Sequence, residues 1–257
     1  MRKLVALLMA VTMMFSITGC STKTDMEDVK EQGKLVVGIT DFAPMDYRDK
    51  DGNWIGFDAE LATKFAESLG VEVEFVEIEW GNKVMELNAK SIDCVWNGMT
   101  LNDEVKSSMS CSNAYCNNAQ IVIVPTNKAD KYNTIESLSD LTFAVEAGSA
   151  GETEALALEL ATTPVLDQAS ALMEVAAGNS QAAIIDSLMA AAMVGEGTSY
   201  ENLTYTVGLN SEEYGVGFRK GSDLTEKLND FFKEVYEDGS MMEIAEKYGV
   251  QAAVIEQ

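Results

Sequence analysis

Two kinds of hydrophobic periodicity alternate along the chain. The apolar, β-branched run 35–39 predicts a buried strand, and apolar residues spaced three and four apart predict a helix that Asp58 caps and Gly70 ends. Apolar and acidic residues alternate over 71–75, as in a strand with one solvated face, and 92–96 predicts another strand. This order of strands and helices indicates parallel strands joined by right-handed crossovers.

The same alternation starts again after the polar stretch 128–133. Strands are predicted at 142–146 and 182–186, and a helix at 152–161 follows the first of them. A returning strand is predicted at 214–218, and two amphipathic helices end the chain. The sequence therefore predicts an α/β fold made of two units and a C-terminal pair of helices.

The N-terminal residues 1–19 predict a signal peptide. A basic start precedes an apolar run of about 12 residues, shorter than the roughly 18 to 20 that cross a bilayer as a helix. The run ends in Ile-Thr-Gly-Cys, like a bacterial lipobox. Cys20 is thus expected to carry lipid, including palmitate, and to hold the mature chain on the extracytoplasmic face of the cell membrane. The alternative is a secretory peptide with an incidental cysteine. The polar segment 20–33 predicts a tether.

Composition narrows the function. The net charge is −24, which argues against nucleic acid and anionic lipid as binding partners. The chain has no histidine, which excludes catalytic arrangements built on histidine and histidine-bearing metal sites. We expect no metal, no cofactor and no catalytic residue. Besides Cys20, the cysteines are Cys94, Cys111 and Cys116, an odd number that leaves their pairing open.

A series of short motifs runs along nearly the whole mature chain. They lie at 35–38, 44–45, 52–58, 69–73, 92–100, 112–115, 185–187 and 214–221. Their order resembles that of the bacterial extracellular solute-binding proteins of family 3, the substrate-binding lipoproteins of ABC transporters for polar amino acids.

The resemblance implies a type II periplasmic-binding-protein-like fold, in which two α/β lobes are joined by two hinge strands. Lobe 1 would comprise 34–119 and 212–257, and lobe 2 would comprise 120–211. The implied function is capture of a small amino-acid-like solute or amine in the cleft between the lobes and delivery to ABC permease subunits. The protein would act without catalysis and as a monomer.

The resemblance also implies a set of ligand-binding residues. Phe42 and Trp80 would form aromatic walls, or belong to the core. Gly98 and Thr100 end a strand, where backbone groups and a hydroxyl can hold an ammonium and a carboxylate. The full set is Asp41, Phe42, Trp80, Asn97, Gly98, Met99, Thr100, Ser149 and Asp186.

Two members of this set have a chemistry of their own. Ser149 lies in a glycine turn that opens a helix, where free amides and the helix dipole attract an anion. Asp186 ends an apolar strand, where an unpaired carboxylate is costly. It is expected to pair with a ligand ammonium, or with a cation inside lobe 2.

One position departs from the family pattern. The residue after Glu104 is Val105, where the family usually has an arginine that grips the ligand carboxylate. Its loss removes a charge-assisted contact worth roughly 1.5 to 3 kcal/mol. Three explanations are open: Lys106 replaces the arginine, the ligand lacks a free carboxylate, or binding is weak.

Two other function classes share the fold. One is a dehydratase-like lyase with Asp186 or Glu146 as its proton donor, although nothing in the sequence requires it. The other is a receptor module that acts through a signalling partner, because no output domain is predicted in this chain.

Overall fold

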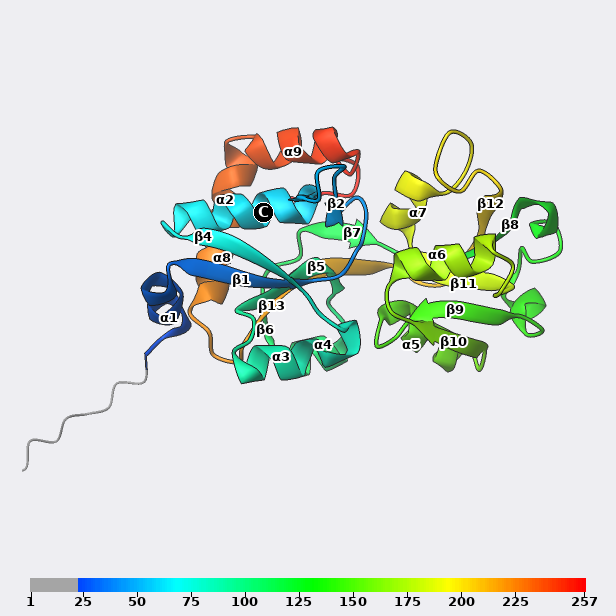
Figure 1. The fold of residues 1–257 in the computed structure, drawn as a ribbon, viewed down its shortest axis with the longest axis horizontal. Helices are drawn as coiled ribbons and strands as arrows, with labels where there is room; N and C mark the ends of the chain where they lie inside the picture. Colours follow the sequence, from blue (N-terminus) through cyan, green and yellow to red (C-terminus); the bar gives the residue numbers. More distant parts are fainter. Residues whose placement is uncertain (1–22) are drawn as a thin grey trace, which may run out of the picture.

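The computed structural model describes residues 23–257, and these form two large sheets and one two-stranded sheet (Figure 1). The first sheet has the order β4-β1-β5-β13-β6, with β7 also paired to β13. The second has the order β10-β9-β11-β8-β12. The predicted signal peptide and Cys20 lie outside the described residues.

The first sheet and its helices form one lobe. β1 is parallel to β4 and β5, and β13 is antiparallel to β5. The strands are β1 (Lys34–Ile39), β4 (Glu72–Glu77), β5 (Cys94–Thr100), β6 (Ser110–Cys111), β7 (Cys116–Asn118) and β13 (Glu212–Phe218), beside the hairpin of β2 (Tyr47–Arg48) and β3 (Trp54–Ile55). The helices are α1 (Asp25–Gln32), α2 (Phe57–Ser68), η1 (Trp80–Asn82), α3 (Lys83–Ala89), α4 (Asp103–Ser108), α8 (Leu224–Glu237) and α9 (Ser240–Tyr248).

The second sheet and its helices form the other lobe. β9 is parallel to β10 and β11, and β8 is antiparallel to β11 and β12. The strands are β8 (Gln120–Pro125), β9 (Thr142–Glu146), β10 (Ala161–Val165), β11 (Ala182–Asp186) and β12 (Leu203–Gly208). The helices are η2 (Thr126–Lys128), η3 (Ile135–Leu138), α5 (Ala150–Ala157), α6 (Gln168–Ala176) and α7 (Ser187–Met193).

The chain crosses between the lobes twice. It passes from the first sheet to the second between β7 and β8, and it returns between β12 and β13 (Figure 1). Two α/β lobes joined by two crossings confirm the predicted fold class. Because β1, β5, β9 and β11 all end at the side that faces the other lobe, their carboxyl ends and the loops after them meet in the middle of the molecule.

Aromatic residues fill the core of the first lobe. α8 buries an apolar face against the sheet, made of Leu224, Leu228, Phe231, Phe232 and Val235. The Phe232 ring lies 5.5 Å from Trp96 and 5.4 Å from Tyr115, both centroid to centroid. These contacts hold the C-terminal helices to the strands that carry the N-terminal half of the lobe.

Asp58 does not cap a helix, contrary to the prediction. α2 begins at Phe57 after Gly56, and the Asp58 side chain is fully buried. Its Oδ2 accepts hydrogen bonds from the Gly98 amide at 2.7 Å and from the Tyr115 hydroxyl at 2.7 Å. Aspartate locally favours a helix end, but here hydrogen bonds from two residues far away in the sequence, Gly98 and Tyr115, outweigh that preference.

The predicted tether is wrong for residues 25–32, because they form α1. Thr24 and Glu27 make a reciprocal capping box at its start. Val29 is the residue that α1 buries.

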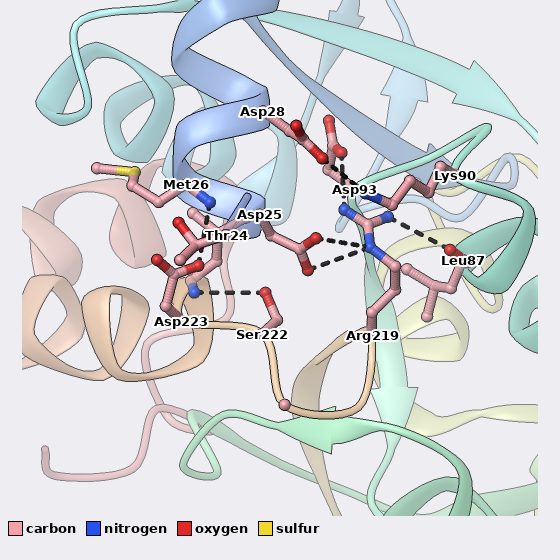
Figure 2. Close-up of polar contacts among 12 residues, drawn as sticks. Thr24, Asp25, Met26, Asp28, Leu87, Lys90, Asp93, Arg219, Ser222 and Asp223 are labelled. Carbon is pink, nitrogen blue, oxygen red and sulfur yellow. Dashed lines mark hydrogen bonds and ion pairs between the residues drawn. The ribbon is translucent and has the colours of Figure 1, made fainter. Parts of the chain in front are cut away.

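Arg219 fastens α1 to the first lobe (Figure 2). Its side chain is 10% exposed, and it pairs with Asp25 at 3.0 Å and with Asp93 at 3.1 Å. The Asp223 carboxylate also accepts from the Met26 amide at 3.0 Å. The start of the described chain is therefore part of the folded lobe.

The structure also bears on the cysteines, on metal-ligating side chains and on membrane-spanning helices. Cys94, Cys111 and Cys116 are all free thiols. Within residues 23–257, no three or more metal-ligating side chains come together. In the same range, no helix is both long enough and apolar enough to cross a membrane.

Candidate functional site

A cleft lies between the two lobes, and the space along its wall that is free of protein atoms, open solvent included, is about 590 Å³. Eight of the nine predicted binding residues line it: Phe42, Trp80, Asn97, Gly98, Met99, Thr100, Ser149 and Asp186. Asp41 does not line this cleft and faces a separate depression beside Glu77 and Asp167. The binding roles of the eight residues stay predictions.

Phe42 and Trp80 are both buried and present in the cleft wall. Phe42 is 2% exposed and meets Tyr214 edge to face at 6.3 Å between ring centroids. A side chain on Gly98, which has a φ of 53°, would place its Cβ 2.4 Å from the Phe42 ring. Glycine is therefore required at position 98 for the ring to reach its place.

The donors expected to hold a ligand carboxylate have protein partners. The Gly98 amide donates to Asp58, and the Thr100 hydroxyl donates to Glu212 Oε1 at 2.9 Å. The Asn97 amide group donates to Asp46 at 2.8 Å and to the Thr40 carbonyl at 3.1 Å. In this structure these residues shape the wall of the cleft and their donors are occupied.

Ser149 lies at the N-terminus of α5, as predicted, although the helix begins at Ala150 rather than 152. Its hydroxyl accepts from the Glu152 amide at 3.1 Å and so caps the helix. The preceding glycine, Gly148, accepts a hydrogen bond through its carbonyl from Lys83 Nζ of the other lobe at 3.1 Å. This contact joins the lobes at one side of the cleft.

Asp186 is held by side-chain amides and not by a cation. Its Oδ1 accepts from Asn118 at 2.5 Å and from Gln120, and its Oδ2 accepts from Gln168. Burial, followed by the charge of Glu212, raises the pKa of Asp186 to about 8. An amide network therefore stands in place of the alternative, a cation inside lobe 2, and pairing with a ligand ammonium stays a prediction.

The amide network spans both crossings between the lobes. Asn118 and Gln120, on the first crossing, also donate to Glu212 on the second, at 2.7 and 2.8 Å. Glu212 Oε2 accepts from Asn210 at 3.0 Å. The cleft therefore borders directly on the polar contacts of the hinge.

Glu146 is a buried carboxyl of the cleft that has a free oxygen. It ends β9, is 3% exposed, and its Oε1 has no hydrogen-bond partner. Burial, followed by the charges of Asp186 and Asp167, raises the pKa of Glu146 to about 8. From the sequence alone, Glu146 is a candidate only as a proton donor.

Position 105, where the family usually has an arginine, is buried among apolar side chains. Val105 is 4% exposed and lies in an apolar cluster with Trp80 and Met99. Lys106 is not in the cleft wall, so it does not replace the missing arginine there. The arginines of the described chain, Arg48 and Arg219, pair with carboxylates elsewhere.

Sequence reasoning missed several residues of the wall. They are Lys83, Val84, Asn102, Gln120, Thr153 and Gln168. These residues share no motif, and they meet because strand ends from different parts of the chain face one cleft. A polar residue just after a buried strand or at a helix start was the available signal, and it fits Gln168, which opens α6.

Comparison with known sequences shows full-length relatives. The arginine-binding extracellular protein ArtP of Bacillus subtilis is 29% identical over 259 residues, covering 96% of this chain and 98% of ArtP. The L-cystine-binding protein TcyJ of Escherichia coli is 28% identical and covers 94% of each chain. Cyclohexadienyl dehydratase of Pseudomonas aeruginosa, an enzyme, matches 59% of this chain at 26% identity.

Comparison with solved structures shows the same architecture. A mutant of ArgBP from T. maritima superposes with a TM-score of 0.81 at 28% identity, covering 87% of this chain and 98% of that one. A substrate-binding protein of an ABC uptake transporter from Streptococcus pneumoniae, solved with bound histidine, has a TM-score of 0.78 at 27% identity and covers 88% and 96%. The type II periplasmic-binding-protein fold is thereby confirmed.

A family model extends this likeness to almost the whole described chain. The model for bacterial extracellular solute-binding proteins, family 3, matches residues 35–251. The full-length relatives are binding proteins, which confirms the expectation that this chain is not an enzyme. The chain belongs to the bacterial extracellular solute-binding proteins of family 3.

Proposed function

We propose that the protein captures a small amino-acid-like solute in the cleft and delivers it to the permease of an ABC importer. The observation that carries the proposal is the composition of the cleft wall. The first lobe contributes Phe42 and Trp80, and the second contributes Glu146, Ser149 and Asp186. Because each lobe supplies only part of the wall, a solute is enclosed only when the lobes close on it.

The names of the relatives support an amino-acid ligand. ArtP is an arginine-binding protein and TcyJ binds L-cystine, and both align over nearly their full length. We propose further that lipid on Cys20 holds the protein, as a monomer, on the extracytoplasmic face of the membrane beside its permease.

A ligand screen tests the proposal. The chain without residues 1–20 is mixed with amino acids, amines, small peptides and organic acids, and unfolding is followed by temperature. A ligand at a hundredfold excess over its Kd should stabilise the protein by about 2.7 kcal/mol. Absence of any shift at millimolar concentration across the whole panel would contradict the proposed function.

A further inference from the structure

Glu146 has an acceptor that no protein group uses. It lies at the end of β9 facing the cleft, with 3% of the residue exposed and Oε1 unpartnered. A buried carboxylate oxygen without a donor costs free energy, so the site favours a ligand that brings the donor.

Asp186 differs from Glu146 in this respect. It ends the neighbouring parallel strand β11, and three side-chain amides already donate to its two oxygens. The acceptor capacity that remains for a solute is therefore greater at Glu146.

The excess of acidic side chains in the wall also favours a cation, because a bound cation stabilises their ionised forms. Glu104, Glu146 and Asp186 line the cleft, and within the described chain Lys83 is its one cationic side chain. The Lys83 ammonium donates to the carbonyls of Trp80 and Gly148 at 3.2 and 3.1 Å. A zwitterion would leave this excess of carboxyl groups uncompensated, whereas a net cation reduces it.

We propose that Glu146 accepts hydrogen bonds from an ammonium or guanidinium group of the solute, so that the preferred ligand is a net cation. The solute is then an amino acid with a basic side chain, or a related amine or guanidine. This inference rests on the proposed function and names its substrate class.

A matched pair of ligands tests the charge of the solute. L-citrulline has nearly the shape of L-arginine but carries a neutral ureido group in place of the guanidinium. Titration calorimetry on the chain without residues 1–20 should give a Kd for L-arginine at least tenfold lower than for L-citrulline. L-lysine against L-glutamine is the second pair, and agmatine and cadaverine cover ligands without a carboxylate.

A matched pair of variants tests the residue. Glu146→Gln keeps the shape and removes the ability to ionise, and it should abolish most of the preference for the cation. Glu136→Gln makes the same change at an exposed position of the same lobe and should leave the preference intact.

The pH dependence of binding tests the role of Glu146 further, because a merely structural role would not produce one. Burial and the charges of Asp186 and Asp167 raise the pKa of Glu146 and hold a proton on it near neutral pH, while the Thr40 hydroxyl and the charge of Lys83 act in the opposite direction. Glu104 and Asp186 also line this space. Because a bound cation requires the ionised carboxylate, affinity for L-arginine should rise from pH 6 to pH 8, by at most about tenfold per unit for one proton. Glu146→Gln should flatten this rise.

The outcomes separate the inference from the proposed function. Equal binding of L-arginine and L-citrulline, or an unchanged preference in Glu146→Gln, would overturn the cation proposal and leave solute capture intact. Tight binding of a neutral or acidic amino acid alone would do the same. Failure of every ligand to bind would overturn both.

Discussion

At the scale of single residues, two buried carboxyl groups accept hydrogen bonds from residues of the cleft wall. Asp58 accepts from the Gly98 amide, and Asp46 accepts from Asn97, so each holds a residue of the wall. Burial raises the pKa of Asp58 to about 7, and burial and the charge of Asp58 raise that of Asp46. The positions of Gly98 and Asn97 in the cleft wall are thus linked to the protonation of these two carboxyl groups.

This linkage predicts a stability that depends on pH. Aspartate in an unfolded chain has a pKa of about 3.9, so the folded state binds more protons than the unfolded state between that value and about 7. Stability from this group is therefore present at low pH and is lost as pH rises through about 7. The free energy of unfolding in urea should fall from pH 5 to pH 8.

Asp58→Asn isolates the contribution of this carboxyl. The amide cannot ionise and still offers an oxygen to Gly98 and Tyr115, so the decrease between pH 5 and pH 8 should become smaller, by up to about 1.4 kcal/mol per pH unit. Glu136→Gln, at the surface, should retain the decrease of the wild-type chain. Equal slopes in all three proteins would show that Asp58 does not titrate in this range.

At the scale of elements, the docking of α1 was not predictable from its own sequence. α1 buries Val29, packs Met26 partly buried against the core, and is otherwise polar, which is close to the composition of a tether. Its fixation depends on Arg219, which is separated from Asp25 by almost the whole described chain (Figure 2). A contact between residues so far apart leaves no pattern in the sequence around either of them.

Arg219→Met should destabilise the first lobe strongly. The change leaves Asp25 and Asp93 without their shared cation, in sites where these side chains are 11% and 6% exposed. Removing one partner of a buried pair costs about 3 to 5 kcal/mol. At roughly 2 to 4 °C per kcal/mol, the Tm should fall by at least about 6 °C.

Arg48→Met is the matched control. Arg48 pairs with Glu77 at 3.0 Å, but both side chains are about half exposed. An exposed pair contributes at most about 1 kcal/mol, so the Tm should change little. A similar loss in both variants would contradict the role assigned to the Arg219 contacts.

Buried central strands were predictable, and the short helices α4 and α7 were not. The strands β1, β9 and β11 lie within a residue of their predicted ranges, because parallel central strands are continuous apolar runs. α4 and α7 have six and seven residues and were not predicted. Their positions are determined by the strands they follow, since so few residues cannot show a helical period.

At the scale of the whole molecule, the cleft could be predicted only through the order of the motifs. Eight of the residues that the resemblance implies line one cleft, but which of their donors are free depends on contacts between distant segments. Thr100 and Glu212, which lie on paired strands, illustrate this, because their hydrogen bond requires β13 beside β5.

Contact between the lobes depends on two glycines. Gly148 of the second lobe lies against Gly81 of the first, and a Cβ at position 148 would be 2.6 Å from Gly81 Cα. No side chain fits there unless the lobes move apart. Gly148 also has a φ of 74°, a conformation that glycine adopts without strain.

Gly148→Ala should therefore hinder closure, and Gly178→Ala is its matched control. Gly178 has a φ of 76°, but a Cβ there meets nothing within 4 Å. Both variants should lose about 1 to 2 kcal/mol of stability from the left-handed backbone. Only Gly148→Ala should weaken solute binding, because its clash involves backbone atoms that cannot rotate away. The loss should be at least about tenfold in Kd, which corresponds to about 1.4 kcal/mol. Titration calorimetry with the tightest ligand of the screen measures this difference, and equal affinities in the two variants would mean that binding does not require the contact between Gly81 and Gly148.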